Sequence, residues 1–210
     1  MNKLFEFDKS YNIVIGTDEA GRGPAAGGVY AAAVYFDKVT DALIADLSRL
    51  NDSKKLSPVA REKLYDVIMN SCINSVICID VDEIEKINIL NSSLKAMKLA
   101  CENVIKKAGL KEFITLVDGN KLIKEYNYPQ KYIVGGDGLS ASIAAASILA
   151  KVTRDRYMTE LASLHPEYGW NRNFGYLTPE HLRAIDEYGL TKYHRPSFLR
   201  KHFEKQLTLF

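Results

Sequence analysis

Residues 11–24 have the sequence YNIVIGTDEAGRGP, and the rest of the chain is best understood from this segment. The apolar, β-branched residues from Tyr11 to Thr17 predict a buried strand. Two acids, Asp18 and Glu19, follow, and a glycine-rich turn comes next. A second apolar run, from Gly28 to Phe36, predicts a second strand. The expected sheet therefore begins with two strands, the first of which ends at carboxylates.

Strands and helices alternate through the rest of the chain. Short apolar runs predict strands at residues 75–80, 113–117 and 131–134. Helices are expected after the N-cap residues Ser57 and Thr178, each followed by proline, and over residues 91–108 and about 140–164. This order predicts the α/β class, with helices packed on a mixed sheet. No linker divides the 210 residues, so residues 1–210 are expected to form a single domain.

The composition is that of an ordinary globular protein, with 47% hydrophobic residues and a net charge of +2. No run reaches the roughly 18 to 20 apolar residues of a membrane span. The first residues lack the basic and apolar regions of a secretory signal. The three cysteines are expected to be buried reduced thiols, which favours the cytoplasm; they are Cys72, Cys78 and Cys101.

Carboxylates follow three of the expected strands. Asp18 and Glu19 follow the first strand, Asp118 the fourth and Asp137 the fifth, each beside a glycine-containing turn. Because ligands of such sheets bind beyond strand ends, the four carboxylates are candidate metal ligands. Carboxylate suits Mg²⁺ or Mn²⁺ better than zinc. Two such ions about 4 Å apart would position a water for attack on a phosphodiester.

Each acid alone has a plainer interpretation. Asp137 precedes the long helix and would complement its dipole, and Asp118 before Gly119 suits a tight turn. Four acids together at strand ends favour the metal site. The four histidines lack a metal-ligand spacing, and we expect surface or packing roles for them; they are His165, His181, His194 and His202.

Several segments suit contact with nucleic acid. Arg22 lies in the glycine turn, and the basic segment 52–56 precedes a helix N-terminus, where phosphate binds well. The rings of an aromatic loop are suited to stacking on a sugar or base, and its tyrosine hydroxyl to a hydrogen bond with a ribose 2′-OH. The alternative is a hydrophobic cluster that closes the sheet edge. The rings of the loop are Tyr168, Trp170, Phe174 and Tyr176. A basic C-terminal segment fits either phosphate contact or a solvated helix face; it carries Lys192, Arg195, Arg200, Lys201 and Lys205.

These segments resemble, in order, the motifs of ribonuclease HII, the type 2 ribonuclease H of bacteria and archaea. The first motif is GTDEAGRGP at residues 16–24. The others are NDSKKL at 51–56, INIL at 87–90, VDGN at 117–120, GD at 136–137, SIAAASILAKVTRD at 142–155, GY at 175–176 and HRPSF at 194–198. An ordered set across nearly the whole chain is highly specific.

The resemblance implies a ribonuclease H-like mixed five-stranded sheet flanked by helices, with a C-terminal helical portion at about residues 165–205. It implies an endoribonuclease that cuts 5′ to ribonucleotides in RNA/DNA hybrids and in duplex DNA, leaving 3′-hydroxyl and 5′-phosphate ends. The implied catalytic and metal-binding acids are Asp18, Glu19, Asp118 and Asp137. The implied substrate contacts are Gly21, Arg22, Gly23, Ser53, Lys54, Lys55 and Tyr176.

Two positions depart from the family pattern. Many members carry lysine where Gly135 stands and a basic residue where Phe174 stands. Each change removes a phosphate contact worth about 1 kcal/mol by analogy with charge-assisted hydrogen bonds.

The alternatives to this assignment are a sister enzyme and a protein without catalysis. The sister type, ribonuclease HIII, usually has an extra N-terminal domain and a different glycine turn, and a first strand at about residue 12 leaves no room for that domain. The competing class is a nucleic-acid-binding module without catalysis. The complete set of four acids favours the enzyme.

The last five residues, QLTLF at 206–210, are a separate signal. They resemble the short motif that binds the bacterial sliding clamp, with Gln206 and Leu207 followed by Leu209 and Phe210. On a mobile tail, two apolar anchors suit a preformed pocket. The alternatives are a tail folded back on the domain and a chance match. We expect a monomer with the clamp as its partner.

Overall fold

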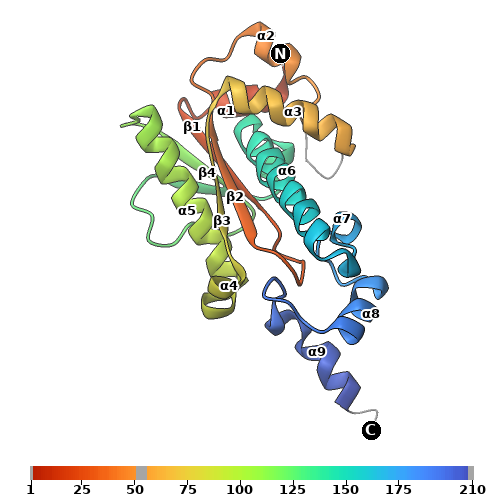
Figure 1. Cartoon of the computed structure of the whole chain (residues 1–210). Helices are drawn as coiled ribbons and strands as arrows, with labels where there is room; N and C mark the ends of the chain where they lie inside the picture. The colour runs from red at the N-terminus through yellow and green to blue at the C-terminus, as the bar shows by residue number, and fades with distance from the viewer. Residues whose placement is uncertain (1, 51–55, 208–210) are drawn as a thin grey trace.

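Five strands form one mixed sheet in the computed structural model of this protein, which describes residues 2–50 and 56–207, the last three by their backbone alone. The strands are β1 (Val14–Ala20), β2 (Val29–Tyr35), β3 (Ile73–Ile79), β4 (Ile114–Asp118) and β5 (Gln130–Ile133). Their order across the sheet is β3-β2-β1-β4-β5 (Figure 1). Pairs β1–β2 and β2–β3 are antiparallel, whereas β1–β4 and β4–β5 are parallel. The predicted mixed five-stranded sheet is confirmed.

The parallel strands end at one edge of the sheet. Thr17 of β1 pairs with Val117 of β4, so the next residues, Asp18 and Asp118, lie at the same level. Asp118 in turn pairs with Ile133, the last residue of β5. The carboxyl ends of β1, β4 and β5 therefore open toward the same region.

Helices cover both faces of the sheet (Figure 1). Alternate residues of β2 point to opposite sides: Ala31 and Ala33 pack in the cluster with α5, and Ala32 and Val34 in the cluster with α6. The helices are α1 (Lys3–Lys9), α2 (Asp41–Asp46), α3 (Pro58–Ser71), α4 (Val81–Ile87), α5 (Ile89–Ala108), α6 (Ala141–Leu164), α7 (Trp170–Asn173), α8 (Pro179–Tyr188) and α9 (Pro196–Leu207). Short 3-10 turns are η2 (Gly136–Gly138) and η3 (Pro166–Tyr168).

Helix α6 approaches β1 at Gly16. A Cβ built on Gly16 would lie 2.2 Å from the backbone carbon of Ser142, so only glycine permits this approach. The alanines at 144–146 are fully buried and keep the helix close to the sheet along its next turns. The segment at residues 11–24 thus determines, through Gly16, where α6 crosses the sheet.

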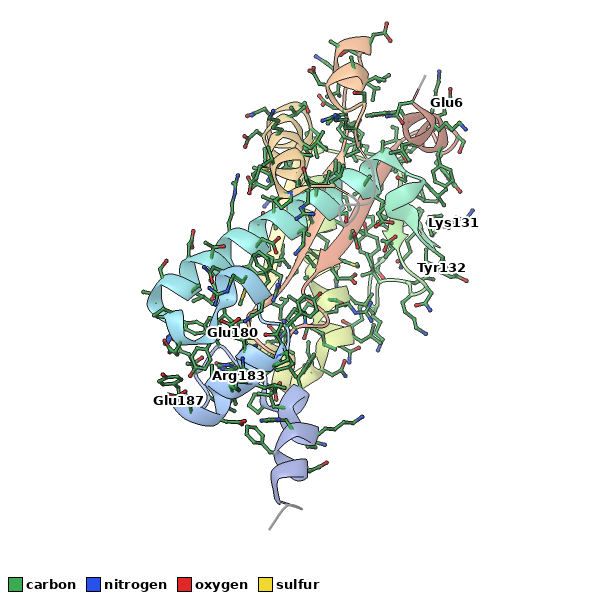
Figure 2. All side chains as sticks on the ribbon, turned by 90° about the vertical axis from the view of Figure 1, so that its right-hand side faces the viewer. Glu6, Lys131, Tyr132, Glu180, Arg183 and Glu187 are labelled. Carbon is green, nitrogen blue, oxygen red and sulfur yellow. The ribbon has the colours of Figure 1, made fainter. Side chains whose placement is uncertain are left out.

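The C-terminal helices form a further hydrophobic cluster with the last turns of α6 (Figure 1). Trp170 and Tyr168 are 0% and 1% exposed there, and their rings stack with centroids 5.0 Å apart. Figure 2 shows Glu180, Arg183 and Glu187 on the outer side of α8. Helix α9 then leads away from the rest of the chain. In the described part of the chain, no helix combines the length and apolarity that crossing a membrane requires.

Several local expectations were wrong or incomplete. Strand β1 continues through Ala20, so Asp18 and Glu19 lie within it and not after it. The reason is that β1 keeps pairing with β2 as far as Ala20 and Tyr30. Helices α1, α2 and α4 were not expected. Cys78 is exposed, although Cys101 is buried as predicted. Helix α9 also includes the first two residues of the expected C-terminal tail.

Candidate active site

The four predicted acids come from the ends of the three parallel strands. Asp18 and Glu19 lie in β1, Asp118 is the last residue of β4, and Asp137 lies in η2, just after β5. The backbone N–H of Gly136 donates a 2.8 Å hydrogen bond to Oδ1 of Asp118. This bond joins the turn that carries Asp137 to the end of β4.

Asp18 is the most buried of these acids, with 6% of its surface exposed. Burial raises its pKa well above the ordinary value, and the charges of Glu19 and Asp118 raise it further. A hydrogen bond from Ser147 and a 2.6 Å bond from the N–H of Glu19 act in the opposite direction. Crowded carboxylates of this kind fit a divalent cation, whose charge would offset both burial and repulsion.

The carboxylate of Glu19 is turned toward the glycine turn. Its Oε1 lies 3.3 Å from Nη1 of Arg22, whose side chain is half exposed. Among the described residues, no three acid, histidine or cysteine side chains are arranged to ligate a single ion. The acids are thus gathered at one sheet edge without forming a closed ligand set.

A cavity of about 320 Å³ lies beside Asp18 and Glu19. The turn Gly21–Gly23 forms one wall of it and Tyr176 belongs to the other. A Cβ built on Gly23 would lie 3.2 Å from Cε1 of Tyr176, so the two walls are in close contact there. Tyr176 itself is 51% exposed, which leaves its ring accessible. The structure therefore brings the predicted glycine turn and tyrosine together with two of the acids.

Three lining residues of this cavity were not singled out from the sequence. They are Ser147, Lys151 and Arg154, all from α6. Their spacing of four and three residues places them on one face of the helix. The sequence feature that could have indicated them is a polar face on an otherwise apolar helix. Lys151 lies with Nζ 4.9 Å from the ring of Phe174, so a cation stays near the position where many family members are basic.

The other predicted contacts have varied outcomes. Ser53, Lys54 and Lys55 lie outside the described residues, as do Leu209 and Phe210. Gln206 and Leu207 belong to α9. Arg195 is fully buried, so the expected basic C-terminal face does not include it.

The aromatic loop and the histidines also divide between surface and core. Of the four aromatic residues, Tyr168 and Trp170 belong to the C-terminal cluster, and Tyr176 alone lines the cavity. His181 and His194 are buried packing residues. The packing alternative therefore holds for Tyr168 and Trp170, whereas the substrate contact of Tyr176 stays a prediction.

Comparison with known proteins agrees with this arrangement. The family model "Ribonuclease HII" matches residues 15–206. A ribonuclease HII of Fusobacterium nucleatum is 48% identical over 206 residues, which cover 98% of this chain and 94% of the relative. The crystal structure of ribonuclease H2 from Pyrococcus horikoshii is 26% identical, with a TM-score of 0.71 and coverage of 92% and 98%.

A further solved structure contains a protein partner. It is the PCNA:RNase HII complex from Archaeoglobus fulgidus, which is similar with a TM-score of 0.70 and 24% identity over 87% of this chain and 93% of that chain. The family model and the Fusobacterium relative each cover nearly all of this chain. The chain therefore belongs to the ribonuclease HII family and is a ribonuclease H, a hydrolase that acts as an endonuclease.

Proposed function

We propose that this enzyme hydrolyses the phosphodiester 5′ to a ribonucleotide, in RNA/DNA hybrids and in duplex DNA with embedded ribonucleotides. The observation that carries the proposal is the shared cavity. Tyr176 and the turn Gly21–Gly23 both line it and are in contact at Gly23, beside Asp18 and Glu19. A phenolic hydroxyl and backbone N–H groups in one cavity are suited to a ribose 2′-OH, the group that distinguishes RNA from DNA.

Ribonuclease H activity in this family depends on divalent metal. We propose that Asp18, Glu19, Asp118 and Asp137 hold two ions, Mg²⁺ or Mn²⁺. When bound, two ions supply an activated water and neutralise charge on the departing oxygen. Glu19 would have to turn from Arg22 to join the ligand set, which would leave the Arg22 guanidinium available to a phosphate. The expected products are 3′-hydroxyl and 5′-phosphate ends.

The polar residues of α6 have supporting roles in this proposal. Ser147 donates a hydrogen bond to Asp18 and so orients the buried carboxylate. Lys151 pairs with Asp155 at 2.7 Å, and its position on the cavity wall adds positive charge near the expected phosphate. Ser53, Lys54 and Lys55 stay proposed phosphate contacts on the sequence motif alone.

The same proposal includes a partner. The C-terminal residues Gln206, Leu207, Leu209 and Phe210 would bind the bacterial sliding clamp through the motif described above. The Archaeoglobus protein binds PCNA in its solved structure, which supports a clamp partner for a protein of this fold. Because the substrate would be chromosomal DNA, we propose the bacterial cytoplasm as the compartment.

The deciding experiment is cleavage of duplex DNA that carries one ribonucleotide, with Mg²⁺ or Mn²⁺. An all-DNA duplex and the variant Asp18→Asn serve as controls. We expect a single cut 5′ to the ribonucleotide, absent in both controls. A folded protein that binds the duplex but cuts it with neither metal would overturn the proposal and favour a binding module.

A further inference from the structure

Two arginines are buried beside the glycine turn and the segment that follows it, and one of them, Arg154, also lines the cavity. Arg154 of α6 is 1% exposed and Arg195, just before α9, is 0% exposed. Among the described residues, neither guanidinium takes part in a salt bridge; both donate to backbone carbonyls. Burial lowers the pKa of Arg195 to about 9, and the nearby charge of Arg154 contributes to this shift. Two close, buried cations are costly, so their contacts must offset that cost.

Among the described residues, the guanidinium of Arg195 donates hydrogen bonds on the side of the glycine turn alone. Its guanidinium donates to the carbonyl of Pro24 at 2.8 Å and twice to that of Gly27, at 2.8 and 2.5 Å. Its backbone N–H donates to Ala25 at 2.7 Å. All of these acceptors belong to the segment that follows the glycine turn. Arg195 therefore joins the C-terminal region to that segment.

Arg154 contacts both walls. Nε donates to Gly28 at 3.2 Å and Nη2 to Ala26 at 3.0 Å, on the side of the glycine turn. Nη1 donates to the carbonyl of Phe174 at 3.1 Å, two residues before Tyr176. The planar guanidinium thus spans two segments that are also joined by a 2.9 Å hydrogen bond from the N–H of Ala25 to the carbonyl of Gly175.

The glycine turn lies directly on this guanidinium. A Cβ built on Gly21 would be 2.2 Å from Nε of Arg154, so the turn is in contact with the arginine at that point. On the opposite wall, Phe174 has a φ of 48°, an unfavourable conformation for a residue with a side chain. Its carbonyl is the one that Arg154 binds. The contact therefore helps to hold a strained turn just before Tyr176.

From these contacts we propose that Arg154 is a positioning residue for ribonucleotide recognition. Together with the backbone bond between Ala25 and Gly175, it sets the separation between the Gly21–Gly23 turn and Tyr176, and thereby the fit of the cavity to a ribose with a 2′-hydroxyl. The inference rests on the proposed function, because it assigns that recognition to the same cavity. Arg154 is not a catalytic residue, since its guanidinium, although it lines the cavity, donates to backbone carbonyls.

The test compares Arg154→Lys with Arg195→Lys. Both variants replace a planar, multiple donor by a point charge at a buried site, but only Arg154 bridges the two walls. The readout is the ratio of dissociation constants for an all-DNA duplex and a duplex with one ribonucleotide, measured by fluorescence anisotropy in EDTA. Cleavage of the second duplex with Mn²⁺ gives kcat and KM, and thermal unfolding gives the loss of stability.

For Arg154→Lys we expect about a tenfold smaller binding preference and a matching rise in KM, with a smaller change in kcat, because the walls lose the side-chain contacts that fix their relative position. Arg195→Lys should lower the melting temperature and keep the preference. Arg154→Gln, which removes the buried charge, serves as a second variant if the lysine variant is unstable.

Three results would overturn the inference. The preference could be retained in Arg154→Lys, it could be lost equally in Arg195→Lys, or both Arg154 variants could fail to fold while Arg195→Lys folds. The last would show that Arg154 serves the fold alone. A wild-type enzyme that neither cuts nor prefers the ribonucleotide duplex would instead remove the proposed function, and this inference with it.

Discussion

At the scale of single residues, the buried acids of the site lower the stability of the folded protein. Asp18 is nearly fully buried beside two other carboxylates, and its raised pKa reflects the free energy of keeping that charge there. A soluble protein tolerates such an arrangement only where function requires it. Activity and stability should therefore respond in opposite directions to the same substitution.

We expect Asp18→Asn to abolish cleavage and to stabilise the metal-free protein. The amide keeps the shape of the side chain but removes the buried charge, which should raise the free energy of unfolding by about 1 kcal/mol, or roughly 2–4 °C in melting temperature. Calorimetry in EDTA at pH 7 measures this. The matched control is Asp46→Asn, an exposed acid in α2, which should change neither property. A destabilised Asp18→Asn protein would contradict the argument.

Tyr176 should contribute through its hydroxyl alone. Because its side chain is 51% exposed, Tyr176→Phe should leave stability unchanged. Loss of one hydrogen bond to the substrate should lower kcat/KM for a single-ribonucleotide duplex by about ten- to a hundredfold. Tyr188→Phe, 59% exposed on α8, is the control and should cut normally. Equal activity of the two variants would exclude a role for the Tyr176 hydroxyl.

The sequence predicted some of these residues and missed others for a physical reason. Asp18 and Tyr176 stand out because an acid in an apolar strand and a tyrosine in a glycine-flanked loop are unusual locally. Arg154 does not stand out, since its partners are backbone carbonyls 126 and 128 positions away in the chain. Such contacts exist only after folding, and no spacing rule indicates them.

At the scale of elements, the strands and the long helices follow from the apolar pattern of the sequence, and the short helices do not. Strands β2, β4 and β5 and helices α5 and α6 lie within two residues of their predicted bounds. Helices α1, α2 and α4 have only six or seven residues each, too few to show an apolar stripe. Their N-caps were nevertheless present in the sequence, as Asn2, Thr40 and Asp80.

The C-terminal elements are joined by a buried chain of rings. Nε1 of Trp170 in α7 donates to Nε2 of His181 in α8 at 3.1 Å, and Nε2 of His194 donates to the same atom at 3.1 Å. Nδ1 of His181 donates to the carbonyl of Tyr176, and Nδ1 of His194 accepts from Thr191. Each histidine thus needs one unprotonated nitrogen, and burial accordingly lowers the pKa of both.

The hydrogen bonds among these buried rings predict that the folded protein loses stability in mild acid. The pKa of His194 is lowered from 6.5 to about 4, so between these values the unfolded chain binds the proton and the folded chain does not. The contribution of His194 is complete above pH 6.5 and decreases as the pH falls, by up to about 3 kcal/mol at pH 4. The raised pKa of Asp18 acts with the opposite sign, because its protonation in the folded state relieves the buried charge.

Urea unfolding from pH 7 to pH 4.5 measures this dependence by comparing variants. His194→Gln should be less stable than the wild type at pH 7, and the difference should shrink as the pH falls. His202→Gln is the control, since His202 pairs with Asp186 at the surface of α9 and is only partly buried. A constant difference between wild type and His194→Gln across this range would show that His194 does not titrate as proposed.

At the scale of the whole molecule, the proposed chemistry and the proposed partner lie apart. The acids and the cavity lie at the carboxyl ends of the central strands, whereas α9 leads away from the rest of the described chain (Figure 1). Helix α9 is anchored at its start, where Glu85 of α4 accepts hydrogen bonds from the N–H and hydroxyl of Ser197 at 3.1 and 2.7 Å. The first two motif residues, Gln206 and Leu207, thus end a helix whose base is held and whose far end is directed outward.

This separation predicts that clamp binding and cleavage can be lost independently. Replacing Leu209 and Phe210 by alanine should remove the two apolar anchors and weaken binding to the bacterial sliding clamp more than about tenfold, because such anchors contribute most of the affinity of short motifs. Surface plasmon resonance with immobilised clamp measures it. Cleavage of a short single-ribonucleotide duplex should be unchanged, since among the residues that the structure describes none beyond Tyr176 lines the cavity.

Thr208→Ala is the matched control, because Thr208 lies between the motif residues and should be replaceable without loss of affinity. Three outcomes are informative. Loss of affinity in the double variant alone assigns the partner to the motif. Equal affinity of both variants would place any clamp contact elsewhere on the molecule, and a double variant with reduced cleavage would show that the C-terminal end also supports the active site. Because α9 directs its end away from the cavity, we expect the first outcome.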